Sequence, residues 1–122
     1  MQMSSDAALD RLRDSIRRFN EERDWGQFHT PKNLAAGLVI EAAEVLEVLQ
    51  WDQAAGGADI PPAKRDRLVE EMGDVLIYLV NLADKLGVDL VEAAASKLRK
   101  NEAKYPAERV RGSAKKYDEY EE

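Results

Sequence analysis

Residues 38–51 read LVIEAAEVLEVLQW, an apolar run interrupted by a glutamate at every third position. This spacing is typical of a helix, in which residues three and four apart share a face. At about 100° per residue, Glu41 falls inside the apolar arc of that helix, Glu44 at its edge and Glu47 on its outward face. Because a buried ionised carboxylate is costly unless it is paired or bound to a metal, the arrangement predicts a partner for Glu41.

A second pair of acids repeats the pattern further along the chain. In the helix predicted for about residues 63–86, Glu71 falls inside an apolar arc that includes Met72 and Leu76, and Asp74 lies at the edge of this arc. Neither acidic helix places a lysine or an arginine inside its arc. Charged residues at helical spacing usually form a solvated face, which is the alternative interpretation of any single pair. Two matching pairs favour a divalent cation bound between the helices.

The type of metal follows from the type of ligand. Carboxylate oxygens suit Mg²⁺, Mn²⁺ or Ca²⁺ better than Zn²⁺ or Cu²⁺. A di-iron carboxylate bundle would need a Glu-x-x-His motif on each of two helices, and the sole histidine, His29, lies in a connector. Mg²⁺ held by a few carboxylates takes the rest of its shell from water and phosphates. The acids therefore predict a phosphorylated substrate.

Glycine, proline and capping residues divide the chain into four predicted helices. With their cap residues, these helices cover about residues 5–22, 30–51, 63–86 and 89–104. Thr30 and Pro31 open the second helix, Gly87 ends the third and Asp89 caps the fourth. The tail from Tyr105 onward has no clear periodicity. Since no segment alternates as a strand does, the predicted fold class is all-α, with four main helices.

Length and composition set the remaining bounds. The 122 residues predict one domain, 1–122, with residues 1–5 and about 112–122 expected to be flexible. The net charge of −6 argues against a nucleic-acid polymer as partner. The absence of cysteine excludes a disulfide framework and a thiolate metal site. The sequence has neither an apolar signal core nor a stretch of about 18 uncharged apolar residues, so we expect a cytoplasmic protein without a membrane partner.

The acidic motifs resemble those of a known enzyme family. Glu41-Ala-Ala-Glu44 and Glu71-Met-Gly-Asp74, separated by 26 residues, resemble the Glu-x-x-Glu and Glu-x-x-Asp motifs of the MazG-like, all-α nucleoside triphosphate pyrophosphohydrolases. Five further segments are similar to the dCTP pyrophosphatase branch of that family and extend the resemblance over nearly the whole chain. They are RFNEERDWGQFHTPKNL, EVLQW, EEMGDVLIYLV, SKLRKNEAKYP and RGSAKKY. The connector DQAAGGADI is the clearest departure.

The resemblance implies an activity, a cofactor and an assembly. It implies that dCTP, or a related and in some cases base-modified dNTP, is hydrolysed to the monophosphate and pyrophosphate, which would cleanse the nucleotide pool. It implies Mg²⁺, with Mn²⁺ as a substitute, bound by the catalytic acids Glu41, Glu44, Glu71 and Asp74. It also implies a four-helix MazG-like bundle that assembles into a homotetramer, with a homodimer as the alternative, and active sites near subunit contacts.

Four residues are candidates for contacts with the base and sugar. The resemblance places Trp25 and Trp51 near the nucleobase, on which an aromatic ring can stack. Tyr78 is four residues past Asp74 and lies on the same helical face, where it can reach the sugar or a phosphate. His29 can contact the base or a phosphate. The alternatives are ordinary packing for the tryptophans and for Tyr78, and a surface position for His29.

Four more residues are candidates for phosphate or base contacts near the end of the chain. Lys97 and Asn101 are four apart on one helical face, and suit a phosphate and either a cytosine edge or a phosphate. Arg111 and Lys116 belong to a basic patch around Gly112 that suits a phosphate. The alternatives are an exposed polar face for the first pair and charge balance against the acidic terminus for the patch.

Two other functions remain open from the residues alone. A broad-range NTP or dUTP pyrophosphatase of the same superfamily would share the metal site and differ in its base pocket. A non-enzymatic helical oligomerisation protein would place the same acids at subunit contacts. For the enzyme, we expect a metal-activated water with one glutamate as its base, and Glu44 is the candidate because the rim of the arc is open to water.

Overall fold

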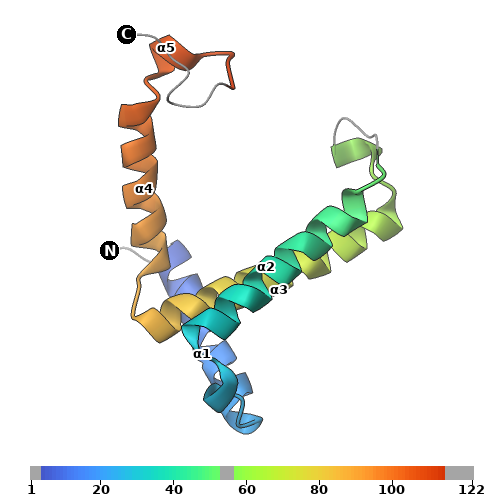
Figure 1. Cartoon of the computed structure of the whole chain (residues 1–122), viewed down its shortest axis with the longest axis vertical. Coiled ribbons are helices and arrows are strands. Elements are labelled where there is room, and N and C mark those ends of the chain that lie inside the picture. Colours follow the sequence, from blue (N-terminus) through green and yellow to red (C-terminus); the bar gives the residue numbers. More distant parts are fainter. Residues whose placement is uncertain (1–3, 53–56, 115–122) are drawn as a thin grey trace. The chain divides into compact units, whose positions relative to one another are not determined.

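The computed structural model describes residues 4–52 and 57–114, and within these residues every regular element is helical (Figure 1). The all-α fold class is therefore confirmed. The elements are α1 (Ser4–Glu22), the 3-10 helix η1 (Gly26–Phe28), α2 (Pro31–Leu49), the 3-10 helix η2 (Gly57–Asp59), α3 (Pro62–Leu86), α4 (Leu90–Lys104) and α5 (Ala107–Val110).

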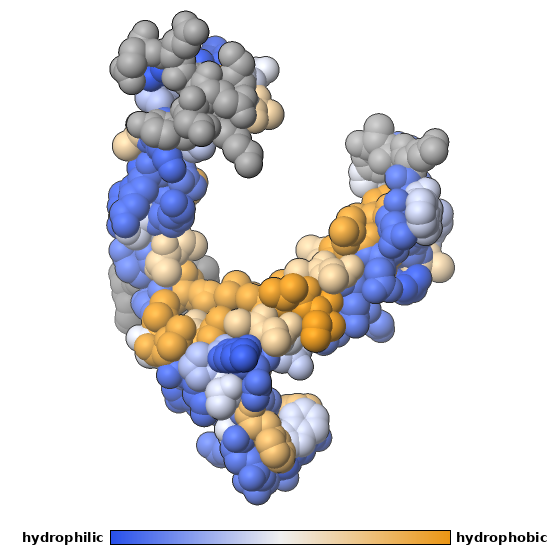
Figure 2. All heavy atoms as spheres, viewed as in Figure 1, coloured by the Kyte–Doolittle hydropathy of each residue, from blue (hydrophilic) through white to orange (hydrophobic). Residues whose placement is uncertain are grey.

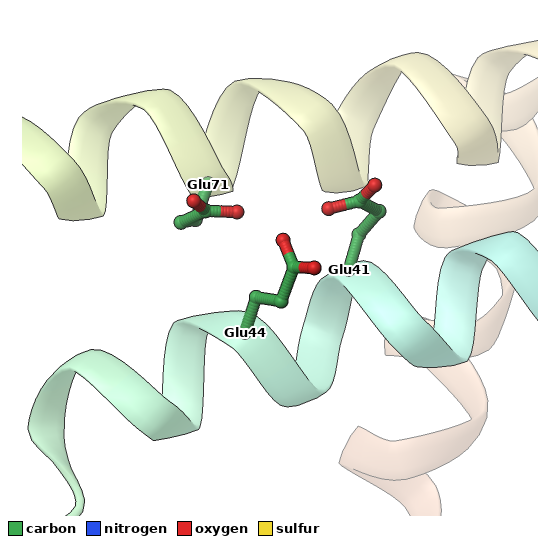
Figure 3. Close-up of side chains that lie close together, drawn as sticks. All are labelled: Glu41, Glu44 and Glu71. Carbon is green, nitrogen blue, oxygen red and sulfur yellow. The ribbon is translucent and has the colours of Figure 1, made fainter.

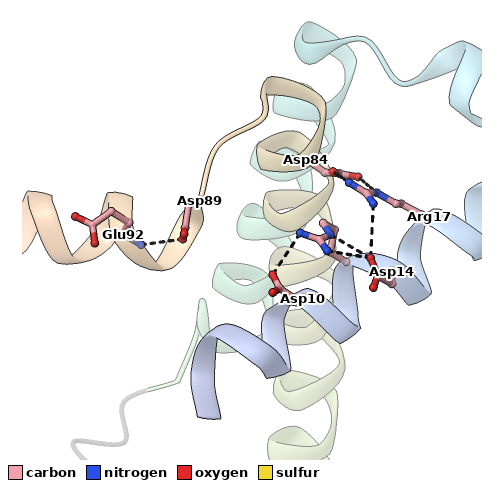
Figure 4. A network of polar contacts seen from close by, with 7 residues as sticks. Asp10, Asp14, Arg17, Asp84, Asp89 and Glu92 are labelled. Atoms are coloured by element: carbon pink, nitrogen blue, oxygen red, sulfur yellow. Dashed lines mark hydrogen bonds and ion pairs between the residues drawn. The ribbon is translucent and has the colours of Figure 1, made fainter. Parts of the chain in front are cut away.

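The predicted helix ends agree with the structure to within about two residues. The side chain of Thr30 accepts a hydrogen bond from the backbone N–H of Asn33 (3.2 Å), and that of Asp89 accepts one from Glu92 (3.0 Å; Figure 4). Gly87 adopts the left-handed conformation (φ 68°), which a glycine at a helix C-terminus tolerates.

Three local expectations need correction. The segment from Ala107 to Val110 forms the short helix α5, although the tail lacks helical periodicity. Helix α2 ends at Leu49, so Trp51 lies in the turn that follows the helix. Ser4 and Ser5 already belong to α1, whereas the other expected flexible residues, 1–3 and 115–122, lie outside the described part of the chain.

The chain divides into two compact units, Met1–Val88 and Asp89–Glu122. In the first unit, α2 and α3 pack side by side and run antiparallel, and α1 packs against α3 (Figure 1). The core is small and consists of apolar side chains from all three helices: Ile16, Leu34, Val48, Val80 and Ala83. A bundle that includes α4 remains a prediction.

Many apolar residues of α2 and α3 stay exposed in the single chain. Figure 2 shows them gathered along these two helices. They are Val39, Ile40, Leu46, Val69, Met72, Leu76 and Ile77. Met72 and Leu76 belong to the apolar arc expected for α3, yet the chain's own core does not cover them. An exposed apolar surface of this extent is typical of an interface with another molecule.

An ion pair attaches α1 to α3. The guanidinium of Arg17 donates through Nε and Nη2 to the two carboxylate oxygens of Asp84, at 2.8 and 2.5 Å (Figure 4). This bidentate geometry is the strongest form of such a pair. The hydrogen bonds from Arg17 lower the pKa of the Asp84 carboxyl, against the opposing effect of partial burial. The pair thus links α1 directly to α3.

We expect Arg17→Gln to lower the melting temperature near neutral pH and to lose this effect in acid. Because the pKa of Asp84 is lower in the folded chain than its ordinary value of 3.8, the pair stabilises the fold above that value. Its contribution disappears as the pH falls through the folded pKa, so the two proteins should then melt alike. Circular dichroism melts from about pH 7 to well below pH 3.8 measure this difference. Arg99→Gln, which removes an ion pair with Glu92 within α4, is the control, and a difference that persists in acid would contradict the assignment.

Candidate metal centre

Three of the four predicted acids meet between α2 and α3. Glu41 and Glu44 lie on one face of α2, and Glu71 approaches them from α3 (Figure 3). One carboxylate oxygen of each residue lies within 4.8 Å of the others. The antiparallel pairing brings them together, because residue numbers rise along α2 as they fall along α3. This grouping offers three oxygen ligands from two rigid helices.

The carboxylates are half-buried, and two of their oxygens have no protein partner. Oε2 of Glu41 and Oε2 of Glu71 are inaccessible to solvent and accept no hydrogen bond from the protein. A buried acceptor without a donor is destabilising unless a proton, water or cation satisfies it. The three carboxylates therefore fit a hard divalent cation, which carboxylate oxygens bind well.

Electrostatics at Glu71 lead to the same conclusion. The pKa of its carboxyl is raised, chiefly by a hydrogen bond shared with Glu44, then by loss of hydration and by repulsion from Glu44 and Asp74. The charge of Arg67 acts in the opposite direction and is the smallest of these influences. Without a cation, the surroundings thus favour the protonated form of Glu71.

Asp74 lies close to this group without joining it. It follows Glu71 by three residues on α3 and is exposed, and it is not among the three residues whose oxygens converge. Its charge nevertheless contributes to the raised pKa of Glu71. Its role as a fourth ligand remains a prediction.

The two predicted tryptophans lie beyond the two ends of α2, and the predicted tyrosine, Tyr78, lies on α3. Trp25 precedes the helix, is 44% exposed and packs edge-to-face on Phe19 at 5.5 Å between ring centroids. Trp51 follows the helix and is 85% exposed. Tyr78 is half-buried, and its ring lies against the backbone of Gly37 on α2. Of these three rings, only that of Tyr78 packs between the two acidic helices.

The side chain of His29 contacts α3. Its Nδ1 lies 3.4 Å from Nδ2 of Asn81, and burial followed by the charge of Lys85 lowers the pKa of the ring. The structure thus assigns His29 a packing partner, and its contact with substrate remains a prediction. Asn81 is not among the predicted site residues, although a polar residue within the apolar run LIYLVNLA is a signal that could have identified it.

The remaining candidates belong to the second unit of the chain. Lys97 is exposed and Asn101 half-buried on α4, and Arg111 is exposed just after α5. Lys116 lies outside the described residues. The carboxylate cluster belongs to the first unit, so phosphate contacts from these residues remain predictions.

The sequence and the structure are both similar to those of known proteins. A sequence model of the MazG-like family matches residues 37–120. dCTP pyrophosphatase 1 of Mus musculus is 46% identical over 116 residues, which cover 93% of this chain and 68% of that protein. The Homo sapiens protein of the same name is 44% identical over 118 residues, with 95% and 69% covered. A pyrophosphatase crystal structure from Archaeoglobus fulgidus matches with a TM-score of 0.76 and 37% identity, over 87% of this chain and 97% of that one.

None of the described helices is both long enough and apolar enough to cross a membrane.

Proposed function

Because the chain belongs to the MazG-like family, we propose that it hydrolyses dCTP, or a base-modified relative, to the monophosphate and pyrophosphate with the help of Mg²⁺. Its broader class, a nucleotide pyrophosphohydrolase acting on dNTPs, follows from the named relatives and the matching pyrophosphatase structure. The observation that carries the proposal is the meeting of three carboxylates with two unpartnered buried oxygens between α2 and α3.

The residues of the cluster would divide the chemical work. Glu41, Glu44 and Glu71 would hold the cation, with Asp74 as a further ligand, and the inner oxygens of Glu41 and Glu71 lack other partners. Mg²⁺ bound there would neutralise the phosphates and lower the pKa of a water; Mn²⁺ could replace it. Glu44 would accept a proton from the attacking water. Attack of this water at the α-phosphorus would release pyrophosphate and leave the monophosphate.

A base-binding site that uses both tryptophans would need a second copy of the chain. Trp25 and Trp51 are separated by the 19 residues of α2, which span roughly 28 Å. A ring that stacks on a base lies within about 7 Å of it, so the two tryptophans of one chain cannot enclose the same base. We therefore propose a homotetramer, with a homodimer as the alternative, whose contacts cover the exposed apolar residues of α2 and α3. The proposed location is the cytoplasm.

A panel of nucleoside triphosphates tests both the activity and the base preference. We expect pyrophosphate release from dCTP or 5-modified dCTP in the presence of Mg²⁺, slower release from dUTP and the purine dNTPs, and none after chelation of the metal. The measurement is coupled detection of pyrophosphate together with chromatography of the monophosphate. Equal rates for all bases would instead indicate a broad-range pyrophosphatase, and no release from any nucleotide would support the non-enzymatic alternative.

A further inference from the structure

Two glycines interrupt the acidic helices, and their surroundings differ. A glycine in a helix interior costs about 1 kcal/mol relative to alanine, so its presence calls for a local reason. At Gly73, in α3, a methyl group would meet nothing within 4 Å. At Gly37, in α2, a methyl carbon would lie only 2.7 Å from Cδ1 and 2.8 Å from Cζ of Tyr78. A glycine is therefore explained at position 37 by the ring of Tyr78, which packs directly against the α2 backbone there.

This contact lies one helical turn from the carboxylate cluster. Gly37 precedes Glu41 by four residues, which is about 6 Å along α2 and on the same face. Tyr78 follows Glu71 by seven residues, two turns along the same face of α3. The ring and the carboxylates are therefore neighbours in the same seam between the two helices.

The ring limits how closely the two helices approach at this point. Carbon atoms in ordinary contact are about 3.5–4.0 Å apart, and Cε1 of Tyr78 is the ring atom nearest to the added methyl group, so that group would have to displace the ring or the helix by roughly 1.5 Å. An aromatic ring is rigid and α2 and α3 are continuous helices, so a displacement at Gly37 extends to Glu41 and Glu44. The carboxylates would then no longer share one cation at their present spacing.

We propose that Gly37 is a positioning residue. Because it has no side chain, the Tyr78 ring packs directly against the α2 backbone, and this contact sets the spacing of α2 and α3 at which the three glutamates bind a divalent cation. The inference rests on the metal site put forward under the proposed function. It concerns the affinity of that site for the ion, and it assigns no contact between Gly37 and the substrate.

Titration with Mn²⁺, followed by the electron paramagnetic resonance signal of the free ion, tests the inference without a substrate. Gly37→Ala is expected to weaken Mn²⁺ binding roughly tenfold, a loss typical of residues that support metal ligands. Gly73→Ala is the matched control, with the same substitution on the partner helix beside Glu71, and should bind Mn²⁺ as the unaltered protein does. Thermal melts without metal establish that each variant is folded.

A double variant separates positioning from a general loss of stability. Tyr78→Leu alone leaves part of the space beside Gly37 unfilled and should also weaken Mn²⁺ binding. Combined with Gly37→Ala, the smaller leucine makes room for the methyl group, so the double variant should bind more tightly than Gly37→Ala. If Gly37→Ala does not fold, Tyr78→Leu decides by itself.

The outcomes distinguish this inference from the metal site. If the unaltered protein takes up no Mn²⁺, the metal site and the inference both fail. If the unaltered protein binds Mn²⁺ and folded Gly37→Ala binds it equally well, only the inference is overturned. A lower melting temperature with unchanged Mn²⁺ affinity would show that the contact serves stability alone.

Discussion

Glu71→Gln is expected to lower kcat/KM for dNTP hydrolysis about 10³-fold and, at the same time, to raise the melting temperature of the metal-free protein. The loss reflects removal of a cation ligand, which weakens transition-state stabilisation by roughly 4 kcal/mol. The gain follows from the raised pKa of Glu71, because the fold disfavours the charge that the glutamine lacks. Steady-state pyrophosphate release and melts in chelator measure the two effects.

The adjacent residue on the same helix offers a matched control. Glu70 precedes Glu71 on α3 but is exposed, so Glu70→Gln removes the same charge without touching the cluster. Its activity and its melting temperature should stay close to those of the unaltered protein. Glu71→Gln that keeps full activity would contradict a role in binding the cation. A lower melting temperature in chelator would contradict the account of crowded carboxylates.

The helices could be predicted from the sequence because the signals for them are local. Helical spacing and caps such as Thr30 and Asp89 act within a few residues of the elements they define. The two acidic helices could be recognised for the same reason, since Glu41 and Glu71 each interrupt an apolar arc on their own helix. That Glu41, Glu44 and Glu71 would approach one another was inferred from the cost of burying them, and the structure brings these three together.

The features that the sequence did not reveal depend on how one helix lies against another. Periodicity places Met72 and Leu76 in an apolar arc, but it does not show whether the chain's own core covers that arc, and the structure leaves both exposed. Two contacts depend on the register between elements distant in sequence. They are the packing of Tyr78 on Gly37 and the contact between His29 and Asn81. For Asp74, the position one turn beyond Glu71 was predictable, but its exposure was not.

Mg²⁺ is expected to stabilise the fold more strongly near pH 8 than at about pH 4.5, the ordinary pKa of a glutamate such as Glu71. The pKa of Glu71 is raised above its ordinary value of 4.5, so protonation stabilises the metal-free fold at low pH, and this contribution is lost as the pH rises through the folded pKa. Once Glu71 has lost its proton, Mg²⁺ can take the place of that proton among the carboxylates. A Mg²⁺ concentration 100-fold above its Kd should then add about 2.7 kcal/mol, which corresponds to roughly 10 °C in Tm.

Melts with and without Mg²⁺ at the two pH values measure this linkage, and Glu71→Gln identifies its origin. In that variant the metal-free protein should lose less stability as the pH rises from about 4.5 to 8, and Mg²⁺ should add little at either pH. The Arg17–Asp84 pair does not interfere, because Asp84 has a lowered pKa and stays ionised throughout this range. A Mg²⁺ effect of equal size at both pH values, or one that Glu71→Gln retains, would place the cation somewhere other than between these carboxylates.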